Sequence, residues 1–263
     1  MKQITVIGGK DKKGQPEAVR LELCAGSVTA IVGPTGSGKS RLLADIEWLA
    51  QGDTPTERRV LVDGAVPEEE ERFATAGKLV AQLSQNMNFV MDASVGEFLR
   101  LHAESRSLET APTVPAKAVA DIAATVVTQA NLLAGEPLTE EMPLTALSGG
   151  QSRALMIADV AFLSESPIVL IDEIENAGID RRSALSLLIR KEKIVLIATH
   201  DPMLALMADQ RLVISGGGIR HILRTTSDEK SLLTALEEQH RQLDTLRHHL
   251  RLGERLNSIL NDH

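Results

Sequence analysis

The chain has 263 residues, enough for one domain, or for a core with an added lobe, around a sizeable buried interior. Its 36 acidic and 28 basic side chains give a formal net charge of −8, and it contains four Phe, one Trp and no Tyr. The charge argues against electrostatic binding to nucleic acid or to an anionic membrane surface. The few rings argue against base stacking on single strands.

Cysteine use and hydropathy bear on location. The single Cys24 cannot form an internal disulfide, which fits a reducing cytoplasm. No apolar stretch approaches the roughly 20 residues of a membrane span. The chain is therefore expected in the cytoplasm, either free or held at the inner face of a membrane by a partner that crosses it.

Short strands dominate the first part of the sequence. Residues 1–7 are too short for a signal-peptide core and are predicted to form an edge strand. Residues 28–32 are a β-branched run of strand character. Residues 59–64 are predicted to be a strand that ends in an Asp-Gly turn.

A glycine-rich turn at residues 33–40 separates strand 28–32 from a segment with apolar residues at helical spacing. Its three glycines let the backbone bend, so that successive N–H groups point at one phosphate chain at the positive end of a helix. Lys39 can reach the β- and γ-phosphates, and the Ser40 hydroxyl can ligate Mg²⁺. The turn and its flanks together predict a nucleoside triphosphate site rather than a chance loop.

The character of the sequence changes twice after this turn. The charge run at residues 67–72 is predicted to be a solvated helix start or loop. Residues 92–148 are alanine-rich and helical, without a strand signal. Residues 149–215 alternate helix with apolar strand, which is typical of a parallel sheet covered by helices, and a last strand is predicted at 219–223.

Residues 228–262 have no β pattern and carry many charges. Leu236, Leu243 and Leu250 are seven apart, but a second line at the same spacing is interrupted by Gln239, so the coiled-coil seam is poor. A terminal helix packed on its own domain is the preferred interpretation, and a dimerising helix is the alternative.

Four further segments indicate the kind of nucleotide-binding protein. Residues 147–151 read Leu-Ser-Gly-Gly-Gln and open a helical stretch. An apolar strand ends in Asp172 and Glu173, a second one ends in His200, and Gln85 follows a shorter apolar run. This set, in this order, resembles the ATPase domain of the ATP-binding cassette (ABC) family over about residues 1–225, with the segment at 147–151 as the family's own signature.

The resemblance implies an α/β fold of the P-loop NTPase class. A parallel sheet flanked by helices is expected, with an antiparallel β portion at the N-terminus, a helical subdomain and a C-terminal helix. Residues 1–91 and 149–226 would form the nucleotide-binding core, residues 92–148 the helical subdomain that ends in the signature, and residues 227–263 the helical tail.

The resemblance also implies ATP hydrolysis, with ATP and Mg²⁺ as ligands. Glu173 would be the general base, His200 would hydrogen-bond the γ-phosphate, and Gln85, preferred over nearby Gln82, would contact Mg²⁺ and the attacking water. Asp172 and Ser40, with Gln85, would hold Mg²⁺. The residues expected to bind the nucleotide are Gly33, Pro34, Thr35, Gly36, Ser37, Gly38, Lys39, Ser40, Arg41, Ser148, Gly149, Gly150 and Gln151.

Two of those groups form separate anion-binding turns. Ser148, Gly149 and Gly150 precede a helix, as the phosphate loop does. A second such turn in one chain suggests that it closes over a nucleotide held by another chain. By resemblance, two subunits would pack head to tail around two ATP molecules, most simply as a homodimer.

Three features depart from the family pattern. Residues 7–19 lack the aromatic ring that usually stacks on adenine, so base recognition is in question. The segment at 174–180, after the two acids, is longer and more acidic than usual. Arg41 replaces a hydroxyl residue and is a candidate for an α-phosphate contact.

The first hypothesis for the partner is a membrane transporter whose transmembrane permease subunits are separate chains. Residues 87–91, directly after Gln85, hold flexible Met and Phe side chains that suit a socket for such a subunit, or that fill the helical subdomain's own core. The alternative is a soluble ABC ATPase that remodels a protein or metalloenzyme complex. Action on nucleic acid is disfavoured by the charge.

Overall fold

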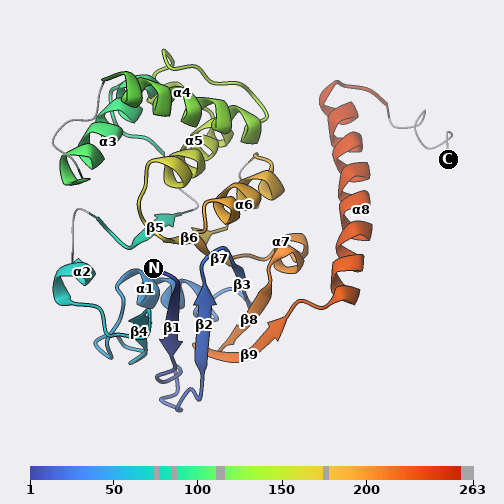
Figure 1. Cartoon of the computed structure of the whole chain (residues 1–263). Helices are drawn as coiled ribbons and strands as arrows, with labels where there is room; N and C mark the ends of the chain where they lie inside the picture. The colour runs from blue at the N-terminus through green and yellow to red at the C-terminus, as the bar shows by residue number, and fades with distance from the viewer. Residues whose placement is uncertain (74–76, 85–87, 111–115, 174–177, 256–263) are drawn as a thin grey trace.

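The computed structural model describes residues 1–73, 77–84, 88–110, 116–173 and 178–255, so Gln85 and most of segment 174–180 lie outside the described residues. Figure 1 shows two sheets in the lower part of the molecule and a group of helices above them. The predicted α/β class is confirmed, including the parallel sheet and the antiparallel portion at the N-terminus. The proposed domain boundaries stay predictions.

The larger sheet has the order β5-β6-β7-β3-β8-β9, and every neighbouring pair except β8 with β9 is parallel. Its central strands are apolar on both faces, as expected where helices or a second sheet cover both sides. Because β6, β7 and β3 are neighbours, their carboxyl ends meet at one edge of the sheet. The strands are β3 (Val28–Val32), β5 (Val80–Leu83), β6 (Ile168–Asp172), β7 (Ile194–Ala198), β8 (Gln210–Ser215) and β9 (Gly218–Arg224).

The smaller sheet is antiparallel, with the order β2-β1-β4. The predicted edge position of the first strand is wrong, because β1 pairs on both sides and buries Ile4 and Val6 completely. The short apolar run of β1 in the sequence does not show how many strands pair with it. The Asp-Gly turn is confirmed, since Asp63 and Gly64 both have positive φ. The strands are β1 (Gln3–Ile7), β2 (Arg20–Cys24) and β4 (Arg59–Val62).

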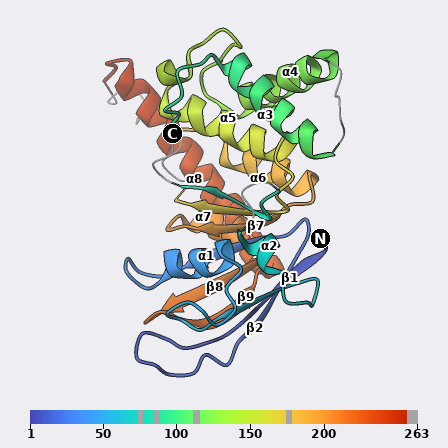
Figure 2. The ribbon, with the colours of Figure 1, turned by 90° about the vertical axis from the view of Figure 1, so that its left-hand side faces the viewer.

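The helices divide into those near the sheets and those above them. Helix α1 packs between the two sheets through Leu42, Leu43 and Ile46, and in Figure 2 α3, α4 and α5 lie above the strands. At the charge run, predicted to be a solvated helix start or a loop, the structure has a helix, α2, which buries no residue. The helices are α1 (Lys39–Glu47), α2 (Glu69–Phe73), α3 (Val95–Thr110), α4 (Ala116–Leu133), η1 (Leu144–Ala146), α5 (Gly149–Phe162), α6 (Arg181–Arg190), α7 (Pro202–Met207) and α8 (Ser227–Arg251).

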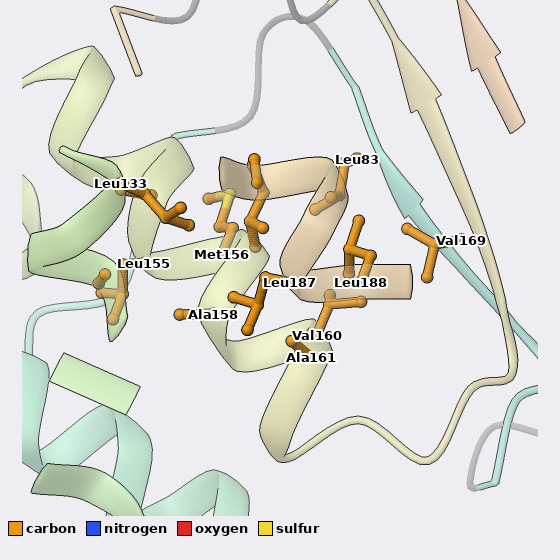
Figure 3. Close-up of a cluster of buried hydrophobic side chains, with 14 of the residues drawn as sticks. Leu83, Leu133, Leu155, Met156, Ala158, Val160, Ala161, Val169, Leu187 and Leu188 are labelled. Atoms are coloured by element: carbon orange, nitrogen blue, oxygen red, sulfur yellow. The ribbon is translucent and has the colours of Figure 1, made fainter. Parts of the chain in front are cut away.

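Helix α5 connects the upper helices to the sheet. Figure 3 shows Met156 and Val160 of α5 in one buried cluster with Leu133 of α4, Leu187 of α6 and Leu83 of β5. Burial of such side chains stabilises the fold by about 1.5–3 kcal/mol each. The start of α5, which carries the signature sequence, is thereby fixed relative to the sheet.

Helix α8 runs along one side of the molecule (Figure 1). It contacts α7, and Glu237 accepts a 3.0 Å hydrogen bond from Arg182 of α6. Leu232, Leu243 and Leu250 are each more than half exposed, whereas Leu236 and Leu246 are partly buried, so the two leucine lines are only partly covered within this chain. Among the described residues, no helix has the length and apolar character needed to cross a membrane.

Candidate active site

The glycine-rich turn joins the end of β3 to the start of α1. Gly36 and Gly38 have φ of 74° and 112°, values that favour glycine. A Cβ at Gly38 would also lie 2.9 Å from the Gly217 Cα, so this position has no room for a side chain. Gly38 is the N-cap of α1 and offers no side-chain hydrogen bond, which leaves the first N–H groups of the helix for a ligand.

Lys39 lies in the floor of this turn. Its ammonium donates a 2.8 Å hydrogen bond to the carbonyl oxygen of Gly33 and lies 3.1 Å from His200 Nε2. The side chain is buried and has no carboxylate as its hydrogen-bond partner in these contacts. A positive charge is thus held where the open N–H groups converge.

A cleft of 610 Å³ opens above Lys39. The ends of β6 and β7 bring Asp172, Glu173 and His200 to it, next to the start of α1. The predicted site residues that line the cleft are Thr35, Gly36, Gly38, Lys39, Ser40, Arg41, Asp172, Glu173 and His200. Gly33, Pro34 and Ser37 lie in the same turn without lining the cleft.

Glu173 has an unusual backbone. Its φ is 52°, in the left-handed region that a non-glycine residue adopts at a cost of about 1–3 kcal/mol, and its N–H donates to the Ala198 carbonyl at 3.0 Å. The carboxylate oxygen Oε1 lies 3.7 Å from His200 Nε2. The backbone therefore turns immediately after β6 and leaves Glu173 beside both His200 and the cleft.

The signature residues lie away from this cleft, at the start of α5. Ser148 is the N-cap: its Oγ accepts from the Gln151 N–H at 3.2 Å, and Gln151 Oε1 accepts from the Ser148 N–H at 2.9 Å. Gln151 also donates to the Pro137 carbonyl at 2.9 Å and is buried. Ser148 and Gly149 are exposed, so the turn faces solvent rather than the chain's own phosphate loop.

The described end of segment 174–180 reaches the signature. A Cβ at Gly178 would lie 3.8 Å from the Gly150 Cα, and the Asp180 N–H donates to the Leu133 carbonyl at 2.9 Å. Arg181, next in sequence, forms an ion pair with Asp201, which follows His200. These contacts tie the segment after the two acids to the signature and to the histidine strand.

Lys12 is a site residue that the sequence reasoning missed. Its ammonium donates a 2.7 Å hydrogen bond to the Gly36 carbonyl and lines the same cleft. Residues 7–19 lack an aromatic ring, but they contain three lysines, Lys10, Lys12 and Lys13, which are the sequence signal for a cation at this position.

The segment proposed as a socket divides between two roles. Phe89 packs on Phe98 in the upper core, with ring centroids 5.1 Å apart, whereas Val90 is 96% exposed. Elsewhere, in the lower part of the fold, Trp48 and Phe73 are 54% and 57% exposed and line one pocket. Two of the five aromatic residues of the chain thus face solvent together.

Comparison with known proteins agrees with this arrangement. The family model described as ABC transporter matches residues 17–176. The uncharacterized ABC transporter ATP-binding protein MJ0121 of Methanocaldococcus jannaschii is 51% identical over 257 residues, which cover 97% of this chain and 95% of that protein.

Two solved structures share the fold. A dimeric post-hydrolysis state of the ATP-binding cassette MJ0796, bound to ADP and Pi, matches with a TM-score of 0.64 and 22% identity, over 85% of this chain and 99% of that one. CbiO1 from Clostridium perfringens, part of the ABC transporter complex cbiONQ, matches with a TM-score of 0.66 and 20% identity, over 95% and 100%. By the family match and the 51% identical relative, this chain belongs to the ABC transporter family.

Proposed function

We propose that the chain binds and hydrolyses ATP in the cleft above Lys39 and passes the resulting motion to a partner. The observation that carries the proposal is the meeting of Asp172, Glu173 and His200 with the phosphate loop in one cleft. Phosphoryl transfer to water needs charge neutralisation and an aligned nucleophile, and these are the groups that supply both.

The proposed roles follow from the contacts. The open N–H groups of α1 and the ammonium of Lys39 bind the β- and γ-phosphates once Lys39 leaves the Gly33 carbonyl. Glu173 accepts a proton from the attacking water, and His200 positions the γ-phosphate. Ser40 and Asp172 offer the oxygen ligands that Mg²⁺ prefers, and the ion would neutralise phosphate charge when bound.

A second copy of the chain completes the site in this proposal. Ser148 and Gly149 are exposed and do not line the chain's own cleft, so their donors are available to a nucleotide held by another molecule. Head-to-tail pairing of two copies would place each signature over the other's phosphate loop. Gly178, five residues after Glu173 in the sequence, lies beside Gly150 of the signature, which supports coupling between the two sites.

The partner that we propose is a membrane-spanning transporter subunit. Support comes from the 51% identical relative, which is named as an ABC transporter ATP-binding protein, and from the exposed pair Trp48 and Phe73. Aromatic residues are enriched at the buried centres of protein interfaces, and this chain has few to spare.

Two experiments test the proposal. Lys39→Ala should abolish ATP hydrolysis while Lys13→Ala, an exposed lysine outside the cleft, should keep it. Full activity in Lys39→Ala would remove the assignment of the site. For the partner, the tagged chain is purified from detergent extract and membrane-spanning subunits are sought by mass spectrometry, with Trp48→Asp as the matched variant. Recovery of soluble proteins alone would support the remodelling alternative instead.

A further inference from the structure

We propose that the nucleoside end of the bound nucleotide lies in a second pocket, held by the cations of Lys12 and Arg41 instead of by an aromatic ring. This rests on the proposed nucleotide-binding function. The pocket has a volume of 340 Å³, within the range of about 300–1,000 Å³ typical of ligand sites. Its lining includes Asp11, Lys12, Gly38, Arg41, Thr56 and Gly217.

The second pocket adjoins the phosphate cleft. Lys12, Gly38 and Arg41 line both. A triphosphate bound at the start of α1 therefore has its remaining end directed past Arg41, in the first turn of that helix, toward this pocket. Lys12 lies at the boundary, because its ammonium is bonded to the Gly36 carbonyl of the phosphate loop at 2.7 Å.

The loop that carries Lys12 is held in a defined shape. The carboxylate of Asp11 is buried and accepts hydrogen bonds from the N–H groups of Lys13 and Gln15, at 2.8 and 2.9 Å, and from Arg220 at 2.6 Å. The Gln15 hydrogen bond and then the Arg220 contact hold the pKa of Asp11 below its ordinary value. The Lys12 N–H donates to the Gly216 carbonyl at 2.9 Å, so the position of Lys12 is set before a ligand binds.

A buried ion cluster fixes this loop to α1. Arg58, which is 0% exposed, donates to both carboxylate oxygens of Glu17, at 2.8 and 2.9 Å, and to Asp45 of α1 at 2.9 Å. It also donates to the Gly217 carbonyl at 2.9 Å, and the Gly217 N–H donates to the Ser37 carbonyl at 2.7 Å. Arg58 is thus a positioning residue for the wall that both pockets share.

The side chains that remain for a ligand are hydrogen-bond donors. Asp11 accepts three bonds within the protein, and Thr56 Oγ1 donates to Asp45 at 2.8 Å. Within the described residues, no hydrogen bond or ion pair engages the exposed Arg41 side chain. Its planar guanidinium can pack on the face of a base, as arginine does in nucleic-acid recognition.

This chemistry sets the base preference. Lys12 offers its ammonium to the edge of the base, where guanine presents two acceptors, O6 and N7, and adenine presents one acceptor and one donor. GTP should therefore bind at least as tightly as ATP. An aromatic platform would stack on either base without this distinction.

Calorimetric titration of the purified chain tests the proposal with ATP, GTP and inorganic tripolyphosphate, each with Mg²⁺. Arg41→Ala should weaken GTP binding on the order of tenfold, the loss typical of one base contact, and change tripolyphosphate binding less than about twofold. Lys12→Ala should weaken GTP binding more than tripolyphosphate binding, because its ammonium lines both pockets. Lys13→Ala is the matched control and should change neither, because its side chain lines neither pocket. Both substituted residues are exposed, and an unchanged melting temperature verifies folding.

Three results would overturn the inference. One is an equal loss of tripolyphosphate and GTP affinity in Arg41→Ala, which would make Arg41 a phosphate contact. Another is unchanged GTP affinity in both variants. The third is ATP binding about tenfold tighter than GTP in the wild-type chain. The Lys39→Ala variant tests the proposed function independently of this inference. Loss of binding of all three ligands in that variant would support the phosphate site, whatever result Arg41→Ala gives.

Discussion

Two glycine-containing turns in this molecule each precede a helix, α1 or α5, and the N-caps of the two helices differ. At α1 the N-cap is Gly38, in a left-handed conformation with no side-chain cap. At α5 the N-cap is Ser148, in an extended conformation, and Gln151 closes a capping box with it. The N–H groups at the start of α1 thus have no side-chain cap, whereas a side chain already accepts a hydrogen bond from one N–H group at the start of α5.

The difference indicates separate tasks. Unpaired N–H groups at a helix start bind anions well, and at α1 they lie above the buried Lys39 cation. In the exposed α5 turn, the Gln151 N–H donates to Ser148 Oγ, but the Ser148 hydroxyl can still donate its own hydrogen to a ligand. In the proposed function, the α1 turn binds the phosphates of the chain's own nucleotide, and the α5 turn contacts the nucleotide held by a second copy.

The largest expected effect separates the two turns by chemistry. Glu173→Gln keeps the shape of the side chain but cannot accept a proton, so turnover should fall by about 10²–10⁴-fold while nucleotide binding at α1 survives. With ATP and Mg²⁺ the unhydrolysed nucleotide should then accumulate a dimer, measured by light scattering. Adding Ser148→Arg should return it to monomer. A double variant that still dimerises with ATP would place the contact elsewhere, with α8 as the first candidate.

The next effect concerns the buried ion cluster of Arg58, Glu17 and Asp45, which supports the turn before α1. Arg58→Ala should lower the free energy of unfolding by about 3–5 kcal/mol, because it leaves the carboxylates of Glu17 and Asp45 buried without their cation. Arg59→Ala, at an exposed neighbouring position, should change it by less than about 0.5 kcal/mol. Urea unfolding measures both. Equal small losses would show that the ion cluster does not hold the turn.

A smaller effect should appear with pH. Burial raises the pKa of Glu17, but the hydrogen bonds and charge of Arg58 outweigh it and hold the pKa below the ordinary value of 4.5. Because the folded pKa is depressed, the stabilisation is present above about pH 4.5 and is lost as the pH falls through the folded value. Glu17→Gln should lower stability at pH 7 and reduce its decline toward pH 3. Parallel pH curves for variant and wild type would contradict this.

The sequence could predict the turn before α1 because the residues that identify it are adjacent in the chain. Residues 33–40 carry the glycines and the cation together, and the apolar strands before Asp172 and His200 fix the edge at which those side chains meet. Lys12 could not be predicted in this way. Its hydrogen bond to Gly36 joins residues 24 apart and depends on the path of a loop held by Asp11 and Glu17.

The same limit applies to strand pairing and to the ion cluster. The apolar run of β1 predicts a strand, but its central place depends on partners from two distant segments. Arg58 stands between the charged residues Glu57 and Arg59 in the sequence, and its complete burial depends on the convergence of Glu17, Asp45 and Gly217 around it. Long-range contacts of polar groups leave no periodic pattern in the sequence.

The smallest expected effect tests the closed turn alone. Gln151→Ala removes the hydrogen bond that Gln151 Oε1 accepts from Ser148 and the one that its amide donates to Pro137. Loss of a helix cap typically costs about 1 kcal/mol, so the melting temperature should fall slightly. ATP affinity of the monomer should be unchanged, because α1 binds without the α5 turn. In the Glu173→Gln background, however, the ATP-dependent dimer should weaken by several-fold, since Ser148 is held less firmly. Thr145→Ala, an exposed residue before the turn, is the control. Weaker ATP binding by the monomer together with an unchanged dimer would contradict the assignment of nucleotide binding to the α1 turn and of dimer formation to the α5 turn.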